Sequence, residues 1–266
     1  MDWFIIYILI GLAVGLIAGM LGIGGGTTLV PLLVFAFTNQ DFDSTKILHL
    51  AIGTTITTIV FTSISSLRQH HRRGVVRWDI FKKATPGLIG GTLLGTFVAD
   101  VLSSESLAIF FVLFVYYSSI KLFFDSNHST KRELPGVIGV TFASILIGII
   151  SSFVGAGGGV ISIPLMVMCN VPILQAVGTS AALGLPIAVA GSIGYIYHGL
   201  GESLLPALSF GYVYTPALLG IVLGTFITVP FGVRAAHQMQ GDSLKKVFAV
   251  LLFLLASRMA WEILGT

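Results

Sequence analysis

The chain has 266 residues, of which 55% are hydrophobic and only 9% are charged. Soluble domains carry about 25% charged residues, so this composition excludes an ordinary soluble fold. A bilayer accepts such a chain, because a helix of about 20 apolar residues spans it and satisfies its own backbone hydrogen bonds. The net charge of +3 does not indicate nucleic-acid binding, since Lys and Arg lie at the ends of apolar runs. We predict an all-α polytopic protein of the inner or plasma membrane.

The first apolar run covers residues 3–37 and is interrupted by Gly22, Gly24, Gly25 and Gly26. It is too long for one straight crossing, and a triple glycine destabilises the interior of a helix. We therefore predict two half-helices joined by an unwound, re-entrant turn. Three uninterrupted apolar runs follow, and we predict helices over residues 47–67, 80–99 and 106–124.

The second half of the chain repeats this order. Gly155, Gly157, Gly158 and Gly159 follow the first glycine set at a constant spacing of 133 and interrupt a run over residues 135–171. Further helices are predicted over residues 173–197, 204–231 and 244–264. The repeat divides the chain into units of residues 1–133 and 134–266.

Two shorter motifs support the same division. Residues 53–55, Gly-Thr-Thr, return as Gly-Thr-Ser at 178–180, and residues 94–97 return as 223–226. Each motif lies inside a predicted helix, so both halves are expected to contain the same set of helices.

Basic residues predict the topology, because Lys and Arg concentrate in cytoplasmic loops. They surround residue 74 in the first half and occupy residues 234–246 in the second, which are not equivalent loops. Three crossings per half would invert the second half and place both clusters in the cytoplasm. This inverted-repeat arrangement is typical of transporters with a midplane site. The alternative is a parallel repeat, in which every glycine-broken segment crosses fully.

An anion site is expected at the two glycine turns. Unpaired N–H groups and a partial positive charge at helix N-termini attract anions, and unwound backbone in a membrane has to line a cavity or be buried. No carboxylate lies mid-span, which argues against a cation substrate. The predicted substrate-binding residues are Gly22, Gly24, Gly25, Gly26, Thr27, Thr54, Thr55, Gly155, Gly157, Gly158, Gly159, Thr179 and Ser180.

Each of these features has a plainer interpretation. Glycines in membrane helices also serve close packing, and the hydroxyls can bond to their own helix backbone. Lys121 and Arg258 are secondary candidates for the anion site. Their plainer interpretation is that both lie near helix ends, from which a long cation extends to the interface. Cys169 is the one cysteine, and no ligands cluster at metal-site spacing, so we expect no metal and no other cofactor.

The two glycine-rich segments, each followed by Gly-Thr-Thr or Gly-Thr-Ser, resemble the TauE/SafE, or sulfite exporter, family of membrane permeases. The resemblance covers nearly the whole chain. It implies transport of a small sulfur-containing anion such as sulfite, thiosulfate, sulfoacetate or a related organosulfonate.

Several alternatives stay open from the sequence. An anion channel would share the same apolar spans, and a proton or sodium ion is a candidate coupling ion. An intramembrane enzyme is a weaker alternative, because no catalytic pair is visible in the spans and the glycine segment lacks the Gly-Lys-[Ser/Thr] ending of a phosphate-binding loop. The direction of transport and the oligomeric state do not follow from the residues.

Overall fold

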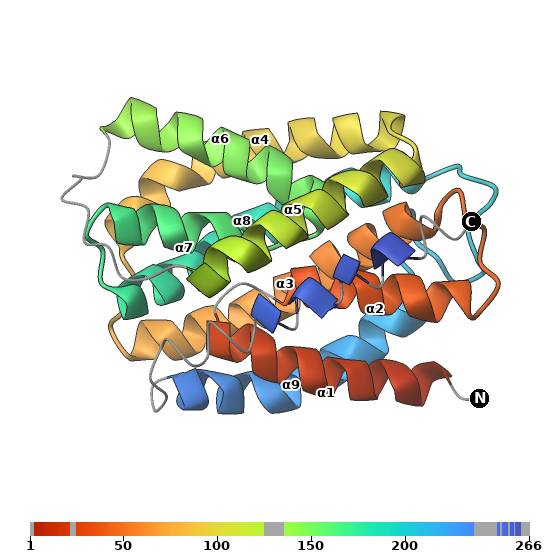
Figure 1. The fold of residues 1–266 in the computed structure, drawn as a ribbon, viewed down its shortest axis with the longest axis horizontal. Helices are drawn as coiled ribbons and strands as arrows, with labels where there is room; N and C mark the ends of the chain where they lie inside the picture. Colours follow the sequence, from red (N-terminus) through yellow and green to blue (C-terminus); the bar gives the residue numbers. More distant parts are fainter. Residues whose placement is uncertain are drawn as a thin grey trace.

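A computed structural model describes residues 3–21, 25–124 and 136–236, and residues 249–261 except 251, 255 and 258. Throughout these residues the fold is built from helices, with one isolated β-bridge between Ser209 and Tyr214. The helices are α1 (Trp3–Leu21), α2 (Gly26–Thr38), α3 (Ile47–Arg72), α4 (Trp78–Val101), α5 (Ser104–Phe124), α6 (Val137–Val154), α7 (Gly159–Met168), α8 (Ile173–Gly199) and α9 (Thr215–Ala236) (Figure 1). A short apolar helix covers Leu252–Trp261.

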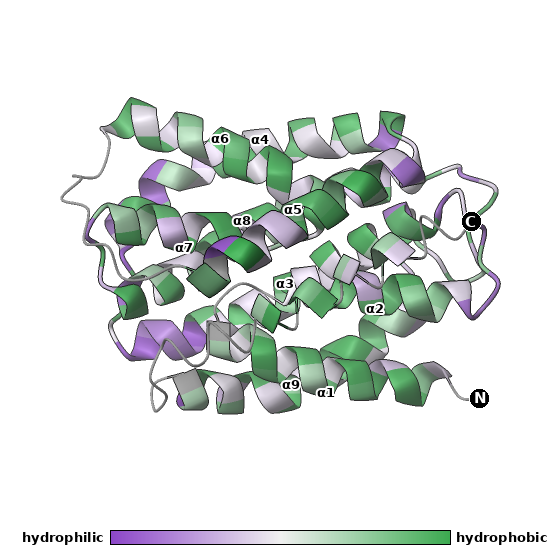
Figure 2. Cartoon of the chain, in the orientation of Figure 1, coloured by the Kyte–Doolittle hydropathy of each residue, from purple (hydrophilic) through white to green (hydrophobic). Residues whose placement is uncertain are grey.

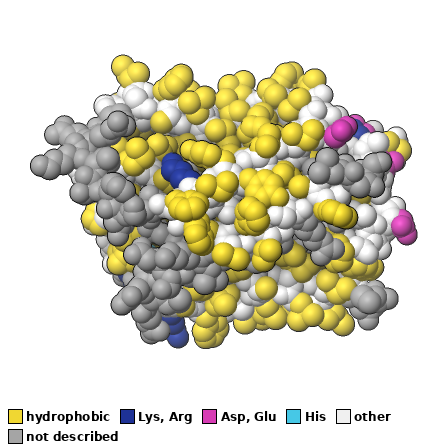
Figure 3. Space-filling model, viewed as in Figure 1, with side chains coloured by type: hydrophobic (Ala, Val, Ile, Leu, Met, Phe, Trp, Pro, Cys, Tyr) yellow, Lys and Arg dark blue, Asp and Glu magenta, His cyan; other side chains and the backbone are white. Residues whose placement is uncertain are grey.

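Seven of the described helices are long and apolar enough to cross a membrane: α1, α3, α4, α5, α6, α8 and α9. Hydrophobic residues follow the lengths of the helices, while hydrophilic ones collect mostly at the two ends of the bundle (Figure 2). The face in Figure 3 is covered largely by hydrophobic side chains. The chain is therefore a multi-pass membrane protein, as its composition predicts.

The first glycine-broken segment folds back on itself. The Gln40 side-chain amide donates a hydrogen bond to the Tyr7 hydroxyl, and the rings of Tyr7 and Phe37 lie 6.5 Å apart. The end of α2 thus returns to the level at which α1 begins. With 13 residues, α2 is too short to cross the hydrocarbon core by itself.

Outer helices pair across the two halves. Helix α1 packs along α9 and α6 packs along α4, and these two pairs flank the central helices α3 and α8 (Figure 1). Glycines permit the close approach. A Cβ on Gly91 would clash with the Ile145 carbonyl, and one on Gly224 would lie 2.6 Å from the Leu12 nitrogen.

This packing changes the repeat alignment of α4 and α9. A Cβ on Gly224 would meet the Ile8 carbonyl and the Leu12 nitrogen, and one on Gly87 would meet the Thr141 carbonyl and the Ile145 nitrogen. Since Thr141 and Ile145 follow Ile8 and Leu12 by 133 residues, Gly87 and Gly224 are the equivalent pair. The match of residues 94–97 with 223–226 differs from this pairing by eight residues, about two helical turns.

The central helices α3 and α8 run in opposite directions. A Cβ on Gly184 would lie 2.8 Å from the Ser63 hydroxyl oxygen, whereas one on Gly178 would lie 3.3 Å from the His70 Cβ. Later residues of α3 therefore meet earlier residues of α8. Both helices are mostly buried inside the protein.

The helix expected over residues 204–231 begins later, at Thr215. Leu208 and Gly211 have left-handed backbones with φ of 69° and 56°, which no α-helix accommodates. A Cβ on Gly53 would clash with the Tyr212 carbonyl. The segment before α9 is therefore a loop seated on α3, and the prediction of a helix there is wrong.

Two ends of the bundle can be defined by their charges. At the Glu202 end, Lys46 forms an ion pair with Glu202 at 2.8 Å, and His198 lies 3.4 Å from Asp100. Both contacts join the first half to the second. The opposite Arg72 end holds the last turn of α3, the first turns of α4 and Arg234 of α9.

Candidate substrate site

The first glycine turn leads directly into the N-terminus of α2. Gly25 has φ of 71°, a left-handed conformation that favours glycine, and its carbonyl accepts the Thr28 and Leu29 N–H groups at 3.2 and 3.0 Å. The N–H groups preceding these lack intrahelical acceptors, as at every helix start. Gly22 and Gly24 lie outside the described residues.

The second turn repeats this geometry at α7. Gly155 and Gly158 have φ of 63° and 76°, and the Gly158 carbonyl accepts the Ile161 and Ser162 N–H groups. All residues from 155 to 159 are buried, Gly157 and Gly159 included. Each turn thus ends one helix and starts another, as the sequence predicts for a glycine-broken segment.

The two turns come together inside the protein. A Cβ on Gly26 would clash with the Gly155 carbonyl oxygen and lie 3.0 Å from the Ile59 side chain. A Cβ on Gly155 would in turn lie 2.8 Å from the Val30 side chain and 3.5 Å from the Thr55 methyl group. The start of α2, the second turn and one face of α3 therefore converge, although 129 residues separate Gly26 from Gly155.

Buried hydroxyls concentrate around the first turn. The side-chain oxygens of Thr27, Thr28 and Thr55 have no hydrogen-bond partner among the described residues, and these residues are 1%, 3% and 0% exposed. Leaving a buried hydroxyl unpaired costs roughly 1–3 kcal/mol. Three such groups beside an open helix N-terminus can donate hydrogen bonds to an acceptor. Thr28 was missed from the sequence, where its only signal is its place in the first turn of α2.

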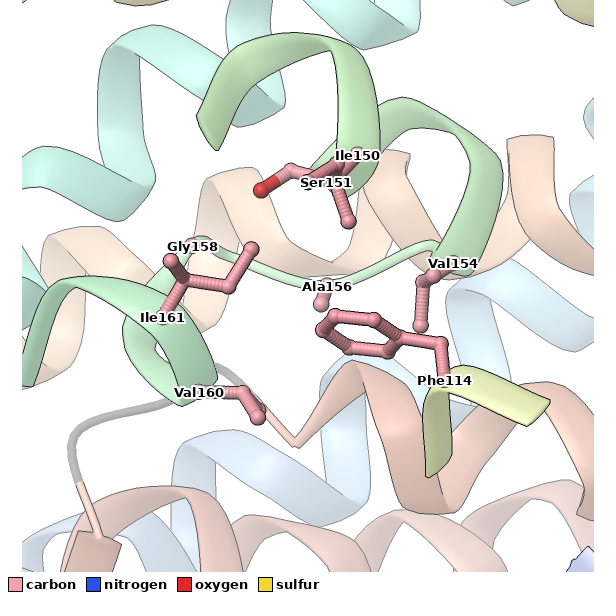
Figure 4. Close-up of a pocket in the computed structure, with 8 residues that line it drawn as sticks. All are labelled: Phe114, Ile150, Ser151, Val154, Ala156, Gly158, Val160 and Ile161. Atoms are coloured by element: carbon pink, nitrogen blue, oxygen red, sulfur yellow. The ribbon is translucent and has the colours of Figure 1, made fainter. Parts of the chain in front are cut away.

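The second turn is more apolar. Val160 and Ile161 stand where the first turn has Thr27 and Thr28, at the repeat spacing of 133. Figure 4 shows Ser151 as the one hydroxyl among the pocket residues drawn there. That pocket leaves no room for a water molecule. Nearby, Ser162 donates a hydrogen bond to the Ser180 hydroxyl at 3.1 Å.

Thr54 and Thr179 each hold a loop in place, and their contact with a substrate stays a prediction. The Thr54 hydroxyl accepts the Tyr214 N–H at 2.9 Å, and the Thr179 hydroxyl accepts the Arg77 N–H at the same distance. Each threonine anchors the loop that precedes α9 or α4. No local sequence pattern indicates this role, because the loop partners lie 160 and 102 residues away.

Arg77 and Tyr212 belong to these two loops. The Asp79 carboxylate raises the pKa of Arg77, and burial raises the pKa of Tyr212 to about 12. Arg77 and Tyr212 therefore do not gain or lose a proton near neutral pH.

The secondary candidates are not gathered at the turns. Lys121 is exposed near the end of α5, and its ammonium group lies 5.9 Å from the centre of the Tyr117 ring. Such a position fits a cation extending to the interface. Arg258 lies outside the described residues. No group of three metal-ligating side chains occurs in the part of the chain that the structure describes.

Comparisons with known proteins give a consistent result. The family model described as "Sulfite exporter TauE/SafE" matches residues 7–259. A probable membrane transporter protein of Haemophilus influenzae is 34% identical, and the alignment covers 95% of this chain and 96% of that protein. The probable membrane transporter protein YunE of Bacillus subtilis is 23% identical, with 97% and 98% covered. No solved structure matches the chain.

Proposed function

Since the chain belongs to the sulfite exporter TauE/SafE family and is a membrane transporter, we propose that it carries a small sulfur-containing anion by alternating access. The observation that supports this most is the meeting of the α2 N-terminus with the second glycine turn beside unpaired buried hydroxyls. The substrate class is sulfite, thiosulfate, sulfoacetate or a related organosulfonate. The relatives named above are described as probable membrane transporter proteins, and we propose no enzymatic reaction.

The electrostatic requirement favours this location. An anion entering a low-dielectric interior loses several kcal/mol of hydration, which paired cations or oriented dipoles have to offset. The glycine turns supply two helix N-termini, at Gly26 and Gly159. Backbone N–H groups and the hydroxyls of Thr27, Thr28 and Thr55 then bind the sulfo oxygens. Hydrogen bonds to a charged group are about twice as strong as neutral ones.

We assign the other predicted residues by their contacts. Gly25, Gly155, Gly157 and Gly158 form the backbone of the turns, whereas Ser180 acts through Ser162. Thr54 and Thr179 hold the loops in place. The positions of Gly22 and Gly24 in the repeat match Gly155 and Gly157, and we retain both as part of the first turn.

The two halves act as inverted repeats in this proposal. The antiparallel course of the equivalent helices α3 and α8 supports it, and so does the return of α2 to the level where α1 starts. Positive-inside bias then puts the Arg72 end, with Arg234, in the cytoplasm. Rocking one half against the other exposes the site to each side in turn.

A vesicle assay tests the function. Purified protein in liposomes is expected to take up labelled sulfite or thiosulfate with a saturable rate and to exchange it against unlabelled anion inside. A rate that stays linear in anion concentration would indicate the alternative, an anion channel. Absence of flux for sulfite, thiosulfate and sulfoacetate, with flux of another anion, would contradict the substrate class.

Single-cysteine labelling tests the topology separately. In a Cys169→Ser background, Arg73→Cys and Arg234→Cys are expected to react with an impermeant maleimide from the same side, and Leu204→Cys from the other. All three side chains are exposed. If Arg73→Cys and Arg234→Cys react from opposite sides, the repeats are parallel.

A further inference from the structure

One face of α3 carries a row of buried hydroxyls. Thr55, Thr58, Thr62 and Ser66 follow one another at spacings of three, four and four residues, which places them along a single helix face. They are between 0% and 5% exposed. The row starts beside the glycine turns and ends one turn before His70, at the Arg72 end.

This face is only partly occupied by hydrogen bonds. Thr58 and Thr62 donate to their own helix backbone, while the side-chain oxygens of Thr55 and Ser66 have no partner among the described residues. Hydroxyls that bond their own helix can still accept from water or rotate to donate to an anion. The row is therefore a polar surface that the present conformation keeps buried.

Helix α8 packs on the adjacent face of α3 through small residues. Gly184 lies against Ser63, and Gly178 lies near His70. Because α8 offers glycines and not large side chains at these contacts, it can move along α3 without withdrawing an interlocked side chain from it. Such a movement would open the edge of the hydroxyl row.

The equivalent face of α8 shows that folding does not require these hydroxyls. At the repeat spacing of 125 residues, Thr58, Thr62, Ser66 and His70 correspond to Leu183, Ile187, Gly191 and Tyr195. The Tyr195 hydroxyl is committed to the Ser152 carbonyl at 2.8 Å. If folding required these hydroxyls, both central helices would be expected to carry them. The hydroxyl row therefore occurs on α3 alone of the two central helices, along the stretch that runs from the glycine turns to the Arg72 end.

We propose that the α3 face from Thr55 to Ser66 lines the route by which the anion passes between the first glycine turn and the Arg72 end. This inference rests on the proposed function. In the opened state the hydroxyls and the water they hold replace part of the hydration shell of the anion. Exposed Arg68, Arg72 and Arg73 at the mouth of the route attract anions toward it.

Cysteine accessibility tests the route. Thr62→Cys and Ser66→Cys are made singly in Cys169→Ser protein, reconstituted in liposomes and treated with an impermeant maleimide from the Arg72 side. Both are expected to react at least about tenfold faster than the matched Leu183→Cys and Ile187→Cys, because only their face opens to water. Added sulfoacetate, which does not react with maleimides, is expected to slow the labelling.

Transport by near-isosteric variants gives a second measurement that does not depend on the cysteine variants folding. Thr62→Val is expected to slow sulfite exchange, while Ile187→Val leaves it unchanged. Equal labelling of the α3 and α8 cysteines, or full activity of Thr62→Val, would overturn the route. Fast α3 labelling in protein that exchanges none of sulfite, thiosulfate and sulfoacetate supports the route but contradicts the substrate class, so the two failures are distinguishable.

Discussion

The two central helices occupy equivalent places in the repeat and differ sharply in chemistry. Both hold a loop through a threonine, Thr54 on α3 and Thr179 on α8, and both lie against glycine-rich partners. Only α3 continues with a buried hydroxyl row, and the first turn of α2 carries adjacent threonines where that of α7 has Val160 and Ile161. Packing and loop anchoring are thus shared by the halves, while the groups that can bind an anion belong mainly to the first half.

This difference separates residues that serve the fold from residues that serve the substrate. A feature present in both halves is explained by the common architecture alone. The unpaired hydroxyls of Thr27, Thr28 and Thr55 at the first turn outnumber those at the second turn, where Ser151 is the one such group among the described residues, and they cost stability that the common architecture does not explain. We therefore expect substitutions in shared features to alter stability, and substitutions in one-sided features to alter binding.

The largest effect is expected where the two turns touch. Gly26→Ala places a methyl group against the Gly155 carbonyl, which is backbone and cannot yield cheaply, so transport should be abolished. Gly90→Ala is the matched control, because a Cβ there meets nothing within 4 Å, and alanine stabilises a helix by about 1 kcal/mol relative to glycine. Exchange of labelled sulfite checks both variants. Transport by Gly26→Ala at the control rate would show that the contact between the turns is dispensable.

A smaller effect is expected for the hydroxyl beside the turns. Thr55→Val should raise the KM for sulfite about tenfold, since a hydrogen bond to a charged group contributes roughly 1.5 kcal/mol or more. Ser180→Ala, at the equivalent position of α8, should change KM less, because Ser180 already accepts from Ser162. Initial rates over a range of sulfite concentrations give both constants. Equal changes of KM in the two variants would contradict the expected difference between the halves.

The loop anchors should behave alike in both halves. Thr54→Val and Thr179→Val each leave a backbone N–H without its acceptor, which costs roughly 1–3 kcal/mol. Thermal unfolding in detergent should therefore show lowered Tm values of similar size for the two variants, with little change in KM for the protein that remains folded. A Tm drop in only one of them would mean that the loops are not equivalent.

The smallest effect is expected at the Glu202 end. The Glu202 carboxylate raises the pKa of Lys46 above its ordinary value of 10.5. The stability from this pair is therefore fully present below pH 10.5 and is lost as the pH rises through the folded-state pKa. A partly exposed pair contributes about 0–1 kcal/mol, so Lys46→Met should lower Tm only slightly at pH 7. The Tm of the wild-type protein should fall at alkaline pH as Lys46 loses its proton, and the variant should not show this part of the fall. Thermal unfolding at several pH values measures the difference.

Local signals in the sequence were sufficient to predict most of the helices. Glycine clusters interrupt long apolar runs, and the helices beginning at Ile47 and Ile173 start where they were expected. The start of α9 at Thr215 was missed, because the loop before it is apolar and looks compatible with a membrane helix. Its loop conformation depends on Leu208, on Gly211 and on contacts with α3, which no local pattern reveals.

The site was harder to predict than the fold. Sequence reasoning grouped Thr54 with Thr55, yet adjacent helix residues face different directions, and only Thr55 lies near Gly155. The loop partners of Thr54 and Thr179 are distant in the chain, so the anchors could not be recognised. The hydroxyl row on α3 was visible as a spacing pattern. Its meaning required the buried environment and the contrast with α8.

Equilibrium binding tests the central claim most directly. Isothermal titration of sulfite into purified wild-type protein is expected to give saturable binding, and the double variant Thr27→Val/Thr55→Val is expected to give none while eluting as the same monodisperse species. The matched double variant Ser162→Ala/Ser180→Ala should bind with nearly the wild-type affinity. Unchanged binding by Thr27→Val/Thr55→Val would contradict the claim that the first glycine turn holds the anion.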